Sequence, residues 1–238
     1  MNYPIWDSFN GFNSRTIFCF WEGTMSPSRE TCFSSLIKNS RCPVVYMSHD
    51  SFVYDWQKEK SPIHPGYHYL SSTQKSDYVR GYMMHHYGGG YTDIKYTTKR
   101  WDTAFDELSK SRFHLGAGYT EIGPHGVAPI DGPLGDEMRA NSDQLIGMCS
   151  FIFKPYTPLT DEWFKNLHQM LDDIYPILEK NPAQYHADHK GFILPSGVPS
   201  GYPIRWTGVG GDIVHPVVYK YRSEILHVDI APQFDNYR

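Results

Sequence analysis

The residue types best suited to chemistry gather in one stretch of the chain, residues 75–95. It contains the carboxylates of Asp77 and Asp93 and the cations of Arg80 and Lys95. Asp77 and Arg80 are three residues apart, so on a helix they lie side by side. An exposed pair of this kind contributes only a few tenths of a kcal/mol, and a surface ion pair is one interpretation. A ligand site is the other, and the neighbouring residues favour it.

Local patterns predict how these side chains are presented. Residues Thr73 to Tyr87 predict a helix, which the glycines at 88–90 end by supplying left-handed positions. A short strand, Tyr91–Tyr96, follows. Ligands of open α/β sheets bind beyond the carboxyl ends of strands, so Asp93 is well placed for a ribose, a sugar or a metal-bound diphosphate. Gly81 lacks a side chain on the polar helix face, where a ligand or a backbone could approach closely.

The rest of the chain alternates short apolar runs with amphipathic segments, which predicts an α/β fold. We expect a Rossmann-like, mostly parallel central sheet flanked by helices, in a single domain over residues 1–238. The predicted strands are Thr16–Trp21, Pro43–Met47 and Leu145–Phe153, with an apolar stretch over 112–119. The predicted helices are Arg29–Asn39, Asp102–Lys110 and Asp161–Lys180. We expect the last helix to be kinked or split at Pro176. An N-terminal arm over 1–13, irregular segments over 122–141 and 181–211, and a compact tail over 214–228 complete the prediction.

Composition excludes several classes of protein. Lys and Arg total 22 against 26 Asp and Glu, a net charge of −4 that offers no footprint for nucleic acid or for a polybasic membrane anchor. No apolar run is long enough to span a membrane, and residues 1–13 lack the pattern of a signal peptide. The four cysteines have no CxxC spacing, which favours free thiols in a reducing compartment, so we expect a cytoplasmic protein. Aromatic residues make up 16%, which suggests either a carbohydrate or nucleotide ligand or rings that coat loops and strands.

Three short motifs combine into a recognisable pattern. Residues 76–80 are SDYVR, residues 87–91 are YGGGY, and residues 93–95 are DIK. This order and spacing resemble the GT-A glycosyltransferases with a DxD region, above all the capsular-polysaccharide, mannosyl and clostridial-toxin types, whose pattern is S-D-x-x-R, a hydrophobic helix, Y-G-G-x-Y and D-x-D. Residues 17–23 are similar to the first strand of that family, and residues 206–216 to its late loop, which closes over the donor.

The resemblance implies a GT-A-like fold with a nucleotide-sugar half over about 14–100 and an acceptor half over about 101–238. It implies transfer of a sugar from a UDP- or GDP-linked donor to a glycan or glycoconjugate acceptor, as in polysaccharide biosynthesis, with retention of configuration favoured. Carried over by motif, Asp77 and Arg80 bind the donor sugar, and Asp93 faces the ribose or a metal. The donor site also takes in Phe20 and Trp21, which flank the base, together with Gly23, Gly89 and Gly90, and the catalytic set is Asp77, Arg80, Asp93 and Lys95.

The chain departs from the family at one position, where Lys95 replaces the second acid of DxD. That acid normally binds Mn²⁺ or Mg²⁺, and a lysine removes the ligand and adds a positive charge. Three explanations stay open. Lys95 replaces the metal as the counter-charge of the diphosphate, or the metal is held by Asp93 with Asp212 or His215, or activity is lost.

Two other classes of protein are compatible with the sequence. A non-catalytic protein that binds nucleotide sugars or carbohydrates would explain both Lys95 and the aromatic content. A zinc hydrolase would use paired histidines, for which the candidates are His64 with His68, His85 with His86, and His186 with His189. The glycines at 208, 210 and 211 do not form a dinucleotide-binding motif, because the pattern predicts no strand before them and no helix after them.

Overall fold

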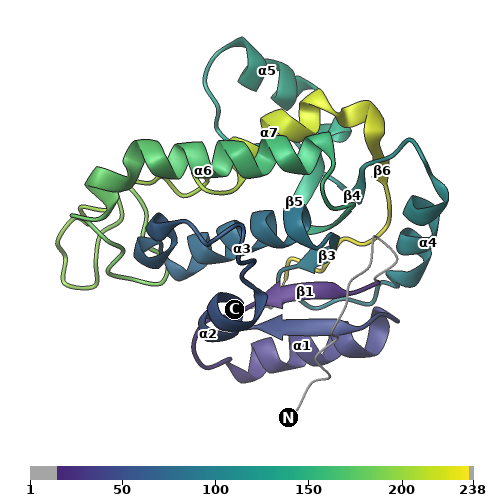
Figure 1. Ribbon diagram of the computed structural model, residues 1–238, viewed down its shortest axis with the longest axis horizontal. Helices are drawn as coiled ribbons and strands as arrows, with labels where there is room; N and C mark the ends of the chain where they lie inside the picture. Colours follow the sequence, from purple (N-terminus) through teal and green to yellow (C-terminus); the bar gives the residue numbers. More distant parts are fainter. Residues whose placement is uncertain (1–14, 236–238) are drawn as a thin grey trace.

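The computed structural model describes residues 15–235, and the predicted N-terminal arm over 1–13 lies outside them. The described chain forms an α/β fold around a six-stranded mixed sheet of order β2-β1-β3-β5-β4-β6 (Figure 1). Only β5 runs against its neighbours, since β3 and β4 each pair with it in antiparallel fashion and the other pairings are parallel. The strands are β1 (Ile17–Phe20), β2 (Val44–Met47), β3 (Gly89–Thr92), β4 (Gly116–Thr120), β5 (Ile146–Phe153) and β6 (Ile225–His227).

Helices connect the strands and cover both faces of the sheet. Figure 1 shows α6, the longest, lying along α3, with α7 and α5 beyond it. No helix among residues 15–235 is both long and apolar enough to cross a membrane. The helices are α1 (Pro27–Asn39), α2 (His49–Ser51), α3 (Ser72–His86), α4 (Asp102–Lys110), α5 (Pro133–Ala140), α6 (Pro158–Leu178) and α7 (Gly211–Lys220), with a π-helical segment at Phe52–Trp56 and a 3₁₀ segment at Pro65–Tyr69.

The alternation of side chains along the strands divides the core in two. In β1, Ile17 and Cys19 face a cluster with residues of α1 and α4, whereas Phe18 and Phe20 face the larger cluster under α3, α6 and α7. Successive strand residues point to opposite faces, so a run that is apolar throughout is buried on both. The predicted strand over Thr16–Trp21 is thus confirmed as β1, buried on both faces, whereas the one predicted over Pro43–Met47 is the edge strand β2 and is only partly buried.

Two segments are more regular than predicted. Pro176 does not split the predicted helix, because α6 runs to Leu178 as one element. A proline so close to the helix end removes few backbone hydrogen bonds, and Leu178 beyond it is fully buried in the core. The segment 122–141 is also not irregular throughout, since Pro133 in the first turn begins α5 directly after Gly132, whose φ is 84°.

The aromatic residues serve the core more than the sequence suggested. Tyr67, Tyr78, Tyr82, Tyr91 and Tyr202 are among the largest fully buried side chains. Buried hydroxyls need partners, and Tyr82 donates to the Ser61 carbonyl oxygen at 2.8 Å while Tyr202 donates to Gln74 Oε1 at 2.5 Å. The tyrosine content therefore does not by itself indicate a ligand.

Gly81 is explained by helix packing. A Cβ atom there would lie 3.0 Å from Leu167 Cδ2 and 3.2 Å from Trp163 Nε1, both on α6. The missing side chain therefore lets α6 approach α3 closely. The space that we expected a ligand or a backbone to enter is filled by side chains of the neighbouring helix.

The α3–α6 interface also buries several imidazole rings. His85 stacks on Phe164 with ring centroids 4.7 Å apart, and His168 lies 4.2 Å from the same ring. Burial, with a smaller contribution from His85, lowers the pKa of His86 to about 4, and burial, with a smaller contribution from His64, does the same for His168. Both rings are therefore neutral in the folded protein at neutral pH.

We predict an acid-sensitive fold. A histidine whose folded pKa is about 4 and whose unfolded value is 6.5 stabilises the fold fully above pH 6.5, and this contribution is lost as the pH falls toward 4. The free energy of unfolding in urea should therefore drop between pH 7 and pH 4.5. The double variant His86→Gln, His168→Gln should show a smaller drop, and exposed His186→Gln the parental one. An equal drop in all three proteins would exclude the buried rings as its source.

Candidate functional site

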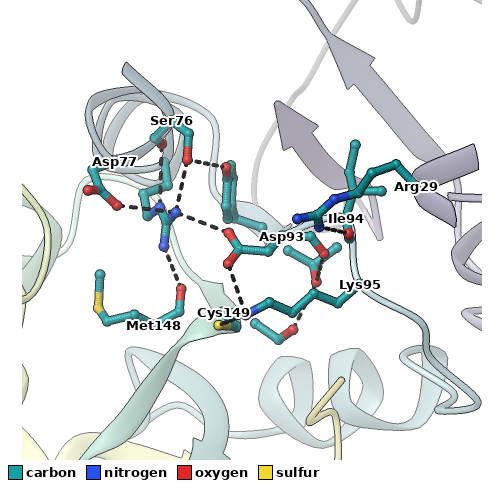
Figure 2. A network of polar contacts seen from close by, with 12 residues as sticks. Arg29, Ser76, Asp77, Asp93, Ile94, Lys95, Met148 and Cys149 are labelled. Carbon is teal, nitrogen blue, oxygen red and sulfur yellow. Dashed lines mark hydrogen bonds and ion pairs between the residues drawn. The ribbon is translucent and has the colours of Figure 1, made fainter. Parts of the chain in front are cut away.

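Four charged side chains meet beyond the carboxyl end of β3. Asp77 and Arg80 come from α3, and Asp93 and Lys95 from the segment that follows β3 (Figure 2). The turn between helix and strand makes this possible, because Gly88 and Gly89 adopt φ of 65° and 88°, values that glycine tolerates best. The predicted helix and glycine turn are thus confirmed, whereas the strand begins and ends earlier than the predicted Tyr91–Tyr96, because β3 spans Gly89–Thr92 and stops before Asp93.

Arg80 is the centre of this cluster. Its Nη2 lies 3.1 Å from Asp93 Oδ1 and 3.2 Å from Asp77 Oδ1. Nη1 donates to the carbonyl oxygen of Met148 on β5 at 2.6 Å, and Nε and Nη2 donate to Ser76. Arg80 is only 5% exposed, so the alternative of a surface ion pair is wrong. The guanidinium joins α3, the end of β3 and β5.

Lys95 occupies the other side of Asp93. Its Nζ lies 3.5 Å from Asp93 Oδ2 and 2.7 Å from the Cys149 sulfur. The Phe234 ring lies 5.1 Å from the same Nζ, which places a π-face beside the cation. Lys95 is 8% exposed. Asp93 therefore offers one oxygen to Arg80 and the other to Lys95, and Figure 2 shows the contact with Lys95.

The electrostatics follow from burial and from these pairings. Burial raises the pKa of Asp93, but the charges of Arg80 and Lys95 outweigh it and leave the pKa below its ordinary value. Burial raises the pKa of Asp77 to about 6, although Arg80 opposes it. Burial raises the pKa of Cys149 to about 11, so this residue is a neutral thiol at pH 7. The negative charges of the two carboxylates and the positive charges of Arg80 and Lys95 therefore nearly cancel.

The end of β1 is linked to this cluster through Arg29. The Arg29 guanidinium lies 4.8 Å from the Trp21 ring centroid and donates to the carbonyl oxygen of Ile94, between Asp93 and Lys95. Trp21 is partly exposed. Sequence reasoning missed Arg29, which it placed only as the start of a helix.

The remaining residues predicted for base binding lie as follows. Phe20 is 5% exposed and packs in the core, so its ring is less accessible than that of Trp21. Gly23 has a φ of 85° and open space around its Cα. Glu22, between Trp21 and Gly23, forms a 2.9 Å ion pair with Lys75 near the start of α3. This edge of the sheet therefore carries one partly exposed aromatic ring and one glycine turn.

Gly89 and Gly90 lie at the opposite end of β3 from Asp93, about 10–13 Å away at the usual rise per residue. A Cβ at Gly89 would lie 2.7 Å from the Thr16 carbonyl oxygen, and one at Gly90 would lie 2.8 Å from the Trp101 ring. Close packing against β1 and against Trp101 accounts for both glycines. The donor contact predicted for them stays a prediction.

The late segment reaches the cluster from a third direction. A Cβ at Gly210 would lie 3.0 Å from the carboxylate of Asp77, so this backbone packs directly on it. The glycines do precede a helix, because α7 begins at Gly211, which corrects the prediction that none follows. The predicted late loop therefore ends at Gly210, and Asp212 lies in the first turn of α7, where it pairs with Arg205.

His215 lies inside the protein, 1% exposed, on α7. Its Nδ1 accepts a 2.9 Å hydrogen bond from the Ala128 backbone N–H, which in a neutral imidazole puts the proton on Nε2. Burial lowers the pKa of His215 to about 4, although Asp212 opposes it, and the ring is therefore neutral at pH 7. Nε2 faces Glu121 Oε2 at 3.8 Å. Glu121 was not among the residues predicted from sequence.

The donor atoms do not fit the metal site predicted from Asp93, Asp212 and His215. Both oxygens of Asp93 face cations, Oδ2 of Asp212 faces Arg205, and neither nitrogen of His215 presents a lone pair, which leaves the buried Oδ1 of Asp212 as the one unpaired oxygen of these three residues. Within residues 15–235, no group of three or more His, Cys, Asp or Glu side chains is arranged to hold a metal ion. The histidines proposed for zinc have other contacts, such as the 3.0 Å pairing of His64 with Asp172 and the ring packing of His85.

Comparisons with known proteins give no further information about this site. The chain matches no protein-family model, and it matches no curated protein.

We predict that Arg80→Met destabilises the fold by about 3–5 kcal/mol, because it leaves the buried carboxylates of Asp77 and Asp93 without their shared cation. Urea unfolding at pH 7.5 measures the loss. Lys165→Met removes an exposed helical pair with Asp161 and should leave the free energy of unfolding close to the parental value. An equally small effect of Arg80→Met would show that the cluster does not support the fold.

Proposed function

We propose that this protein is a GT-A-like glycosyltransferase that moves a sugar from a nucleoside diphosphate donor to a glycan or glycoconjugate acceptor. The observation that carries the proposal is the cluster of Asp77, Arg80, Asp93 and Lys95 beyond the carboxyl end of β3. The six-stranded mixed sheet is compatible with such a fold. In open α/β sheets, ligands bind at this edge.

The cluster suits the two ends of such a donor. Carboxylates accept hydrogen bonds from hydroxyls, so Asp77 and Asp93 suit the sugar and the ribose. Cations stabilise the charge that develops on a leaving diphosphate. Trp21, partly exposed and linked to Ile94 through Arg29, suits a nucleotide base because an aromatic ring can stack on it.

In the proposed transfer, the bond between the sugar C1 and the β-phosphate oxygen breaks, and its electron pair leaves with the diphosphate. A bond forms between C1 and the acceptor oxygen. The acceptor hydroxyl proton passes to the leaving diphosphate, which makes a separate protein base unnecessary. We favour retention of the anomeric configuration.

A second candidate is a non-catalytic protein that binds nucleotide sugars. The observation that favours it is the mutual neutralisation of the four charges, since Asp93 is paired on both oxygens. Both candidates require donor binding, and only the first requires turnover. A panel of UDP- and GDP-sugars separates them, with thermal shift measuring binding and release of nucleoside diphosphate measuring hydrolysis or transfer.

We predict that Asp93→Asn lowers turnover of the best donor at least a hundredfold, because the neutral amide removes the charge that lies between Arg80 and Lys95. Circular dichroism and the melting temperature verify that the variant is folded. Asp136→Asn, an exposed position on α5, is the matched control and should keep parental turnover. Parental turnover in Asp93→Asn would rule out Asp93 as a catalytic residue.

A further inference from the structure

We infer that Lys95 is the built-in cation of the donor site and that this protein binds nucleoside diphosphates without a divalent metal. The inference rests on the proposed function and deepens it. It commits to one of the three explanations that the sequence left open. The Lys95 ammonium group would contact the diphosphate and supply the positive charge that a metal ion would otherwise supply.

The first argument is the charge count. Asp77 and Asp93 carry two negative charges, and Arg80 and Lys95 carry two positive charges within 3.5 Å of them. A divalent cation added here would meet no net negative charge, and it would lie next to the Lys95 ammonium. Mg²⁺ and Mn²⁺ bind through oxygens, with Mg²⁺ at about 2.0–2.1 Å, and both oxygens of Asp93 already face cations.

The second argument is that nearby groups cannot replace the missing acid. His215 accepts from the Ala128 N–H through Nδ1, so Nε2 carries the proton and has no lone pair for a metal. Asp212 is paired with Arg205 through Oδ2, and this pairing also anchors Arg205 next to the Pro129 carbonyl oxygen. The buried Oδ1 of Asp212 has no hydrogen-bond partner, so Asp212 and His215 together would offer a metal a single ligand atom, and no group of three His, Cys, Asp or Glu side chains within residues 15–235 is arranged to hold one.

The third argument distinguishes the two cations. Arg80 donates to charged and carbonyl oxygens on α3, after β3 and on β5, so its directions are fixed by the fold. Lys95 instead donates to the sulfur of Cys149 at 2.7 Å. A neutral thiol is a weak acceptor, and a phosphate oxygen is a strong one. A diphosphate can therefore replace the Cys149 contact with little loss of free energy.

The residues around Lys95 also hold its ammonium group in place. It is 8% exposed, with Asp93 on one side and the Phe234 ring on another, as the contacts around it in Figure 2 illustrate for Asp93 and Cys149. A confined ammonium loses little further side-chain freedom when it meets a ligand. Lys95 therefore combines a fixed position with a contact, to the Cys149 sulfur, that a phosphate oxygen can replace.

The test measures binding of UDP and GDP by calorimetry in EDTA and in Mg²⁺ or Mn²⁺. We expect a parental Kd that agrees within about threefold across these conditions. Lys95→Met should weaken nucleotide binding at least tenfold. Lys95→Arg, which keeps the charge, should lose much less affinity. Lys99→Met is the matched control, because Lys99 pairs with Asp229 outside the cluster, and it should bind as the parent does.

A second measurement uses Mn²⁺ alone and needs no nucleotide. Electron paramagnetic resonance should detect no tightly bound Mn²⁺ on the parent protein, and it should detect bound Mn²⁺ on Lys95→Asp, which restores the second acid. Parental nucleotide binding that is lost in EDTA, or tight Mn²⁺ binding by the parent, would overturn the inference and leave the proposed function standing. Absence of nucleotide binding under every condition would overturn the proposed function itself, and the inference with it.

Discussion

The buried guanidinium of Arg80 is the interaction on which the site depends. It ties α3 to the residue that follows β3 and to the main chain of β5, three segments that are separate in the sequence. A guanidinium presents five donors in a rigid plane, so it fixes directions as well as distances. Asp77 and Asp93 can stay charged next to each other inside the protein because this cation lies between them and Lys95 pairs with the second oxygen of Asp93.

The antiparallel course of β5 completes the arrangement. Because β5 runs against β3, its early residues lie beside the end of β3, and the Asp93 N–H donates to the Cys149 carbonyl oxygen at 2.8 Å. Met148 then supplies a carbonyl oxygen to Arg80, and Cys149 supplies a sulfur to Lys95. A parallel strand at this position would bring its far end here instead.

The near-neutral charge of the cluster shapes the chemistry we propose. An excess of carboxylates would attract a metal ion, whereas paired charges exchange partners with a ligand that itself carries hydroxyls and phosphates. The raised pKa of Asp77 fits this view, since burial is opposed there by Arg80 alone, whereas at Asp93 it is opposed by both Arg80 and Lys95. The backbone of the late segment packs on Asp77 at Gly210 and so covers this carboxylate.

The sequence by itself determined the elements whose patterns are local. Apolar runs predicted β1, β2 and β5, and glycines after a periodic segment predicted the end of α3, because burial on both faces and left-handed turns leave direct signatures. The sequence also predicted that Asp77, Arg80 and Asp93 lie close together, because one helix and one short turn connect them. Only the tertiary structure decided the rest. Helix α7 contains Pro216 and several valines and is stabilised by burial rather than by propensity, and Arg29 and Cys149 join the site through partners more than fifty residues away.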